Sequence, residues 1–220
     1  MALTKYNFNS FDVTSAASKA LGFNSSANGF TTIDPGSMTH IKTLTASSSS
    51  TISFAHGSSD VVLDSTYPVY LFKFINIHPE TNSKEFRFNG SIDSGSNYNV
   101  TKTSTSFEVS HYEDDSLTNF RYRTDQDQAQ STDFHPLIAD IGNLADECAV
   151  GRMYLFNPAS TTFVKHFIIE FQNYVANNQS QQNFSGGYFN TTSAVDAIQF
   201  KMNTGNIDSG TIKLYGIKDS

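Results

Sequence analysis

The chain has 220 residues, a net charge of −7 and a single cysteine, Cys148. A chain of this length can bury the core of one all-β domain, and one cysteine excludes an intrachain disulfide framework. The 14 Lys and Arg residues form no cluster, so the basic stripe with which nucleic-acid binders neutralise phosphates is missing, and we expect no nucleic-acid partner.

The opening segment MALTKYNFNS has neither the apolar core nor the basic flank of a secretory signal. No apolar run reaches the roughly 18–20 residues of a transmembrane helix, so we expect a soluble chain without membrane insertion. Six Asn-X-Ser/Thr triplets occur, and without a secretory leader we interpret them as chance matches in an Asn-, Ser- and Thr-rich chain. They begin at Asn24, Asn89, Asn99, Asn178, Asn183 and Asn190.

Residues 1–40 scatter aromatic side chains among small polar residues, with weak periodicity. Such a segment buries little by itself, yet it is too aromatic for a typical disordered linker. Two interpretations stay open: an edge strand wrapped over the same domain, or an arm whose aromatics anchor it to a neighbouring subunit. The candidate docking residues are Tyr6, Phe8, Phe11, Phe23 and Phe30.

From Ile41 onward, apolar and polar residues alternate with a period of two, which predicts half-buried strands whose apolar side faces a core. The clearest runs are KEFRFNG (84–90), TSFEVSHY (105–112), TNFRYRT (118–124) and DAIQFKM (196–202). Two denser runs, VYLFKFINI (69–77) and TFVKHFIIEFQNYV (162–175), are typical of central strands covered on both sides.

The segment HPLIADIGNLADECAV (135–150) carries Leu137, Ile138 and Ile141 at helical spacing, interrupted by Gly142. We expect a short helix or an irregular crossover there. The C-terminal run TIKLYGI (211–217) can place Ile212 and Leu214 in the core, as a closing strand would.

The sequence thus offers about ten strand candidates, separated by loops of Gly, Ser, Asn and Asp. Eight strands in two packed antiparallel sheets form a jelly roll, which protects its edges better than an open sheet does. We therefore predict an all-β jelly-roll β-sandwich over residues 41–220, with an extended N-terminal arm or edge-strand segment over residues 1–40.

The sequence offers no catalytic or metal motif. The six histidines lack ligand spacing, His166 is best interpreted as a strand residue bonded to a neighbour, and neither phosphate-binding loops nor a nucleophile elbow occurs. Strand acids at i and i+2 would supply a glycosidase pair, but Glu85, Glu108 and Glu170 are followed by Arg87, Ser110 and Gln172. The acidic cluster YEDD (112–115), with Asp125 and Asp127 beyond it, could hold Ca²⁺ but is more simply a solvated loop. We predict no catalytic residue, no metal and no cofactor.

Carbohydrate-binding modules on similar folds present aromatic platforms to sugars. The ten tyrosines leave this possibility open although tryptophan is absent. The candidate glycan contacts are Tyr112 and Tyr188, because both lie near predicted loops.

Three segments resemble a recurring set of tailed-phage virion proteins, most similar to those of marine and cyanobacterial phages, which often end in a GTIKLYGIK-like strand. They are residues 69–101, LFNPASTTFVKHF (155–167) and residues 187–218. The resemblance covers about residues 41–218, is more specific in the C-terminal third than elsewhere, and is weaker over the first forty residues. It implies a jelly-roll virion component and brings no catalytic motif with it.

Together these features favour a non-enzymatic structural protein, made in the cytoplasm of a host bacterium and exposed on the virion surface. We expect a homo-oligomer, with a trimer as the favoured form, that contacts other virion proteins of the capsid or tail. Capsid decoration or a similar peripheral role ranks first. A tail-fibre module that binds host surface glycans is the alternative, and a polysaccharide depolymerase ranks third.

Overall fold

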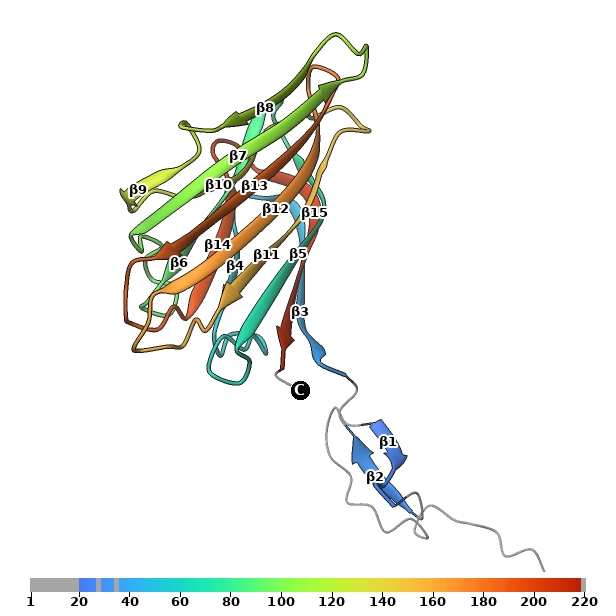
Figure 1. Cartoon of the computed structure of the whole chain (residues 1–220), viewed down its shortest axis with the longest axis vertical. Coiled ribbons are helices and arrows are strands. Elements are labelled where there is room, and N and C mark those ends of the chain that lie inside the picture. Colours follow the sequence, from blue (N-terminus) through green and yellow to red (C-terminus); the bar gives the residue numbers. More distant parts are fainter. Residues whose placement is uncertain (1–19, 27–28, 34–35, 219–220) are drawn as a thin grey trace, which may run out of the picture.

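A computed structural model describes residues 20–26, 29–33 and 36–218, and these residues form an all-β protein without a helix. With no helix there, nothing in this part of the chain is a candidate helical membrane span. Figure 1 shows the strands, which pair antiparallel throughout. They are β1 (Ala20–Phe23), β2 (Phe30–Ile33), β3 (Met38–Ser49), β4 (Ile52–Ala55), β5 (Val69–Pro79), β6 (Lys84–Ser91), β7 (Lys102–Tyr112), β8 (Thr118–Tyr122), β9 (Gln128–Ser131), β10 (His135–Ile141), β11 (Ala149–Phe156), β12 (Lys165–Val175), β13 (Gln179–Phe189), β14 (Ala197–Met202) and β15 (Ile207–Ile217).

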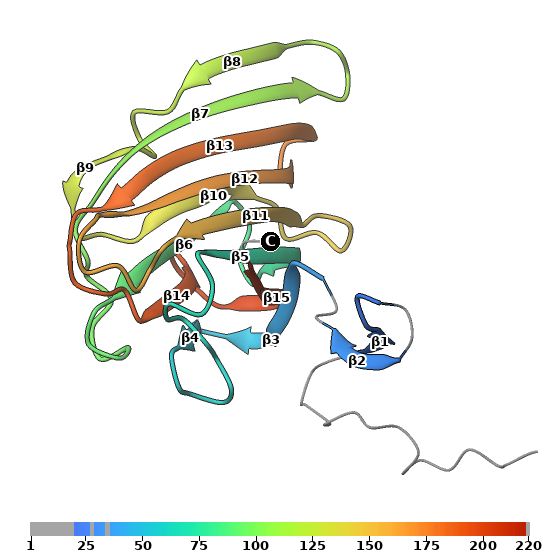
Figure 2. The ribbon, with the colours of Figure 1, turned by 60° about the horizontal axis from the view of Figure 1, so that its bottom comes forward.

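The main sheet branches at β12. One run of neighbours is β3-β15-β5-β11-β12-β13-β7, with β8 and β9 on the far side of β7. The other is β10-β6-β14-β4, which joins β12 only through the pair Ile141–Val175. Seen from its end in Figure 2, the large run arches over the small one, and the end strands β3 and β4 follow one another in the chain. The result is a nearly closed, barrel-like sheet.

Phenylalanine rings fill the space between the two runs. Phe74 of β5 lies 5.1 Å from Phe200 of β14, and Phe88 of β6 lies 5.2 Å from Phe167 of β12, measured between ring centroids. Both pairs meet edge to face, which is the arrangement that aromatic quadrupoles favour. Each fully buried Phe contributes about 1.5–3 kcal/mol to folding. The fully buried phenylalanines are Phe54, Phe72, Phe74, Phe86, Phe88, Phe167, Phe171, Phe189 and Phe200.

The closing strand behaves as the sequence predicts. Ile212 and Leu214 of β15 are fully buried, and β15 pairs with both β3 and β5. Of the two alternatives expected within residues 135–150, the short helix is wrong, because this segment forms the irregular strand β10 and then a loop into β11. The three apolar residues that suggested a helix, Leu137, Ile138 and Ile141, are all fully buried in β10.

The irregular pairing of β10 explains why its spacing looked helical. Its register against β6 shifts twice, and Asp140 has a φ of 58°. Two carbonyl groups of β10 accept hydrogen bonds from side chains of neighbouring strands: Asn183 Nδ2 donates to Leu137 O at 3.1 Å, and Asn173 Nδ2 donates to Ala139 O at 2.9 Å. Buried carbonyls need such donors when the strand ladder is interrupted.

Residues 20–33 contribute a separate two-stranded sheet in which β1 pairs with β2 from Ala20–Ile33 to Phe23–Phe30. Two of the five predicted docking aromatics meet in this hairpin, with the rings of Phe23 and Phe30 stacked 5.3 Å apart. The other three, Tyr6, Phe8 and Phe11, lie outside the described residues.

Candidate functional site

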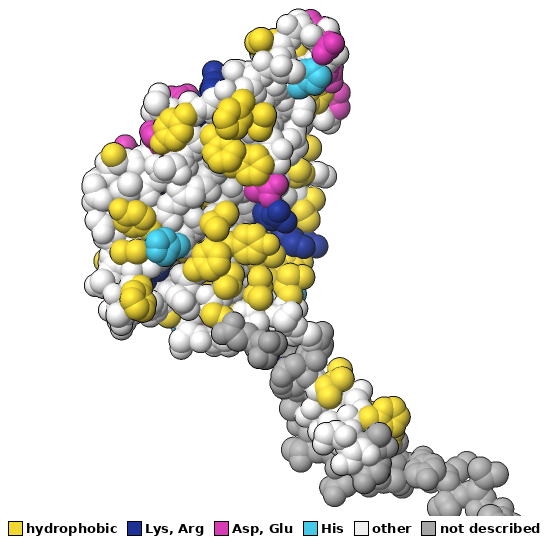
Figure 3. Space-filling model, in the orientation of Figure 1, with side chains coloured by type: hydrophobic (Ala, Val, Ile, Leu, Met, Phe, Trp, Pro, Cys, Tyr) yellow, Lys and Arg dark blue, Asp and Glu magenta, His cyan; other side chains and the backbone are white. Residues whose placement is uncertain are grey.

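The face of the large run that points away from the small run is rich in exposed apolar side chains. Phe120 is 71% exposed, Ile168 55% and Val109 38%. Figure 3 shows apolar side chains spread over the face formed by β8, β7, β13, β12, β11 and β5. We call this surface the outer face. Its most exposed apolar and aromatic residues are Ile75, Phe107, Val109, Phe120, Tyr122, Val150 and Ile168.

The outer face reverses the expected orientation of two strands. The alternation in β7 and β8 was expected to turn Phe107, Val109 and Phe120 toward a core, but these residues are exposed. Glu108, on the opposite side of β7, is 2% exposed. The strands were therefore predicted, but the assignment of their apolar side to the core is wrong.

The physical reason lies beneath β7. After β8 the chain stays beside β7, where the Arg123 backbone N–H donates to Ser106 O and the Gln128 N–H donates to Ser104 Oγ. The side chain of Arg123 is buried and pairs with Glu108, while Arg121 binds the other oxygen of Glu108 at 3.0 Å. A second carboxylate, that of Asp125, binds Arg123 at 2.8 Å. An apolar side chain at position 108 would leave the buried guanidinium of Arg123 without this carboxylate, so the inner side of β7 carries a polar residue there.

An aromatic cluster occupies the outer face at β7. Phe107 stacks on Phe184 of β13 at 5.0 Å between ring centroids, and Phe120 of β8 lies 5.7 Å from Phe107. Cross-strand pairing sets this geometry, because Phe107 is directly opposite Phe184 in the register of β7 and β13. A flat ring surface of this kind can receive an apolar protein surface or the face of a sugar.

A polar group lies beside the aromatic cluster. Arg152 of β11 binds Glu170 of β12 through Nε at 2.9 Å, and Gln182 Nε2 donates to the other oxygen of Glu170 at 3.1 Å. The hydrogen bond and charge of Glu170 raise the pKa of Arg152 above its usual value. Lys73 of β5 is directly opposite Arg152 in the register, so one negative and two positive groups form a row.

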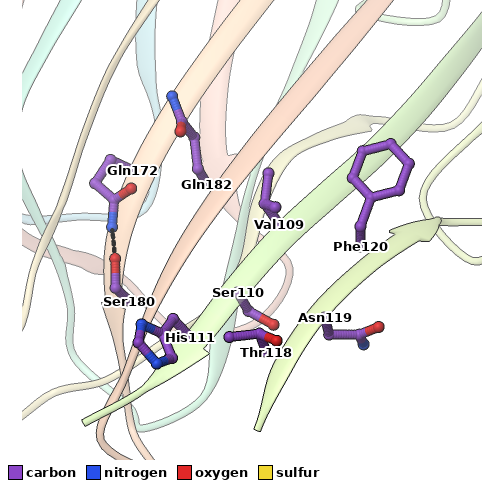
Figure 4. A pocket seen from close by; sticks show the side chains of 9 residues that line it. All are labelled: Val109, Ser110, His111, Thr118, Asn119, Phe120, Gln172, Ser180 and Gln182. Carbon is purple, nitrogen blue, oxygen red and sulfur yellow. Dashed lines mark hydrogen bonds between the residues drawn. The ribbon is translucent and has the colours of Figure 1, made fainter. Parts of the chain in front are cut away.

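Three shallow hollows run along the outer face next to this row, with volumes of about 400, 520 and 410 Å³. All three hollows are lined by Gln172. The first and second also share Ser180, and the second and third share Val150, so together they form one interrupted groove. Figure 4 shows the first hollow, in which Phe120 and Val109 lie on one side and the amides of Gln172 and Gln182 on the other. Gln172 Nε2 donates to Ser180 Oγ at 2.9 Å.

The two predicted glycan contacts lie on the same sheet but do not form one site. Tyr112 lines the second hollow, where its hydroxyl accepts a hydrogen bond from Asn177 Nδ2 at 3.1 Å. Tyr188 packs against His166 at 6.0 Å between ring centroids. Tyr112 pairs with Gln179 at the start of β13, nine positions before Tyr188, which is about 30 Å along a strand.

Among the described residues, no group of three or more His, Cys, Asp or Glu side chains is placed to hold a metal ion. In the acidic loop, Asp115 binds His111 at 3.0 Å and Asp114 accepts from the Ser116 N–H, which fits a solvated turn. The strand acids that could have formed a glycosidase pair are each bound to an arginine instead: Glu85 to Arg87, Glu108 to Arg123 and Glu170 to Arg152. Two of the six glycosylation triplets begin at fully buried residues, Asn89 and Asn183.

Comparison with known proteins adds little. The chain matches no protein-family model and no curated protein. A crystal structure of a structural-genomics protein of unknown function from Bacteroides ovatus aligns with a TM-score of 0.26 and 7% identity. The alignment covers 48% of this chain and 45% of that one. This similarity is too low to support a conclusion about fold or function.

Proposed function

We propose that this protein is a non-enzymatic structural component on the surface of a tailed-phage particle, a capsid decoration or similar peripheral subunit. The resemblance of residues 41–218 to phage virion proteins motivates the phage assignment. In this proposal the fold is a jelly-roll sandwich, with β10-β6-β14-β4 as the smaller sheet and the strands from β3 to β7 as the larger one. The phenylalanine core between the two runs supports this interpretation.

The exposed outer face is the observation that carries the proposal. Contiguous exposed apolar surface on a folded chain marks a site of protein association. Here aromatic and branched residues from β7, β8, β11 and β12 share one face, and an Arg–Glu pair lies among them. Such a mixture of aromatic rings with Arg is typical of interface cores. The expected partners are further copies of this chain, in a trimer, and other proteins of the capsid or tail.

The N-terminal segment supports the same proposal. The hairpin presents Leu21, 58% exposed, and Phe23, 69% exposed. Both are large apolar residues of the kind that anchor an arm on a neighbouring subunit.

Quantitative mass spectrometry of purified particles tests this function. Hundreds of copies per particle would place the protein on the head, and a dozen or two would place it on the tail. Absence of the protein from particles would contradict the proposal. Deletion of residues 1–40 should abolish incorporation, and normal incorporation of the truncated chain would refute the role of the arm.

A second candidate is a glycan-binding module of a tail fibre, which the groove on the outer face favours. Planar amides from Gln172 and Gln182, across the first hollow from the ring of Phe120, provide hydrogen bonds and an apolar platform together. If sugars bind there, Tyr112→Ala should weaken glycan-array binding, whereas Tyr188→Ala, about 30 Å away along β13, should leave it unchanged. Equal loss from both variants would argue against a glycan site in the groove. Hydrolysis of the host polysaccharide that a single Asp or Glu substitution abolishes would instead support a depolymerase.

A further inference from the structure

Two buried side chains, Asn89 near the end of β6 and Lys102 at the start of β7, contact each other. Lys102 Nζ donates to Asn89 Oδ1 at 2.7 Å and to Val100 O at 3.0 Å. Both residues are fully buried. The ring of Phe189 covers Nζ, 5.8 Å from the ring centroid.

A lysine in this position is energetically unfavourable as an ammonium ion. A fully buried charge is normally paired with an opposite charge, yet Lys102 takes part in none of the ion pairs among the described residues. Burial lowers the pKa of Lys102 to about 7, although the charge of Asp133 opposes this shift. At neutral pH a large fraction of the side chain is therefore a free amine, which is a nucleophile.

The side chain of Asn89 is held as an electrophile would be. Its Oδ1 accepts from Lys102 and also from the Gly90 backbone N–H at 2.8 Å, so two donors polarise the carbonyl group. Its Nδ2 donates to Tyr98 O and to Thr132 O, both at 2.8 Å. These four contacts fix the amide, and its carbonyl oxygen lies 2.7 Å from the amine.

We propose that Lys102 and Asn89 join in an intramolecular isopeptide bond. The neutral Nζ attacks Cγ of Asn89 and a new Nζ–Cγ bond forms. One proton moves from Nζ to Nδ2, the Cγ–Nδ2 bond breaks, and Nδ2 leaves as ammonia. The products are an amide and one ammonia, so the step needs no oxidant, reductant or other reactant.

A buried histidine, His135, feels the charge of Lys102. His135 is fully buried, its Nδ1 lies 3.3 Å from Ser104 Oγ, and its Nε2 has no hydrogen-bond partner among the described residues. Burial, and after it the charges of Lys102 and Arg87, lower the pKa of His135 to about 3.

The bond would remove the buried charge and connect the two runs of the main sheet. Asn89 belongs to β6 in the smaller run and Lys102 to β7 in the larger one. A chain without a disulfide would gain a covalent link between its layers. A particle subunit exposed to the environment would benefit from such a link, although the inference itself depends only on the contacts above.

Intact-mass spectrometry of the purified full-length chain tests the proposal. We expect a mass that is lower than the sequence mass by one ammonia. Trypsin should also fail to cleave after Lys102, and fragmentation should show residues 89 and 102 linked. An unmodified mass with normal cleavage after Lys102 would refute the bond, and this result does not depend on any variant.

Two substitutions separate the bond from other sources of ammonia loss. Asn89 precedes a glycine, and such a pair can also lose ammonia by closing a succinimide with the Gly90 nitrogen. Lys102→Met should restore the full mass, whereas ammonia loss that persists in this variant would identify the succinimide and overturn the proposal. Lys165→Met is the matched control, because Lys165 is equally buried but donates only to backbone carbonyls of Phe163 and Thr191. This variant should keep the ammonia loss.

Discussion

The buried pair of Glu108 and Arg123 offers the sharpest test of the reversed orientation of β7. Glu108 is 2% exposed and accepts hydrogen bonds from Arg123 and Arg121. Glu108→Gln keeps the size of the side chain but removes its charge, which leaves the buried guanidinium of Arg123 with only the exposed Asp125 as a counter-ion. Breaking a buried pair in this way costs about 3–5 kcal/mol of unfolding free energy.

The outer face supplies the matched control. Glu170 forms a similar pair with Arg152, but the side chain of Arg152 is 53% exposed, so Glu170→Gln should cost less than about 1 kcal/mol. Urea unfolding monitored by tyrosine fluorescence gives both values on the same scale. Equal small losses for the two variants would mean that the inner side of β7 is open to water, and the assignment of the outer face would then be wrong.

Three further predictions concern the core, the sheet and pH. Phe200→Ala should cost about 3–5 kcal/mol of unfolding free energy, because this ring is fully buried in the core. Phe120→Ser on the exposed outer face should change the same quantity by about 0.5 kcal/mol or less. A large loss from Phe120→Ser in the monomer would show that this ring is buried. Gly187→Ala should cost about 1–3 kcal/mol of unfolding free energy, measured by urea unfolding, because the added methyl would lie 2.5 Å from Thr103 O. Gly186→Ala is the control and should be nearly neutral, because the nearest atom to its added methyl is 3.9 Å away. The reverse order would contradict the packing of β13. Burial lowers the pKa of His135 to about 3, so between pH 6.5 and 3 the unfolded chain binds more protons than the folded one, and the free energy of unfolding falls as pH falls. His135→Gln should flatten this part of the curve of stability against pH by up to about 4–5 kcal/mol. An unchanged curve would show that His135 does not titrate as described.

The existence of most strands could be predicted from the sequence, because alternation reports directly on the pleat. The run at 69–77 lies within β5, and β12 and β14 cover most of the runs at 162–175 and 196–202; the core-facing residues of these strands are buried. The all-β class follows from these runs together with the polar loops between them.

The side of a strand that is buried could not be predicted in the same way. In β7, alternation gives two faces, and a period of two cannot say which one a later segment will cover. One weak signal was available, because the residues on the face opposite Phe107 and Val109 are polar. Ser104, Ser106 and Ser110 are small and polar, and all three are buried.

Contacts between distant residues were also beyond sequence analysis. Asn89 and Lys102 are each unremarkable in the sequence, and only the fold brings Nζ and Oδ1 within hydrogen-bond distance. The same holds for Asn173 and Asn183, which look like surface residues but bind the irregular backbone of β10. Here the tertiary structure decides the role of a residue, and local composition does not.

The border of the sheet beyond β7 limits how copies of this chain can grow into larger assemblies. Two short strands, β8 with five residues and β9 with four, divide that border between them. An uninterrupted border invites an incoming chain to extend the hydrogen-bond ladder, whereas a short and broken one gives it little to follow. Strand pairing with another chain at this end would therefore be short, which disfavours growth into a continuous ribbon.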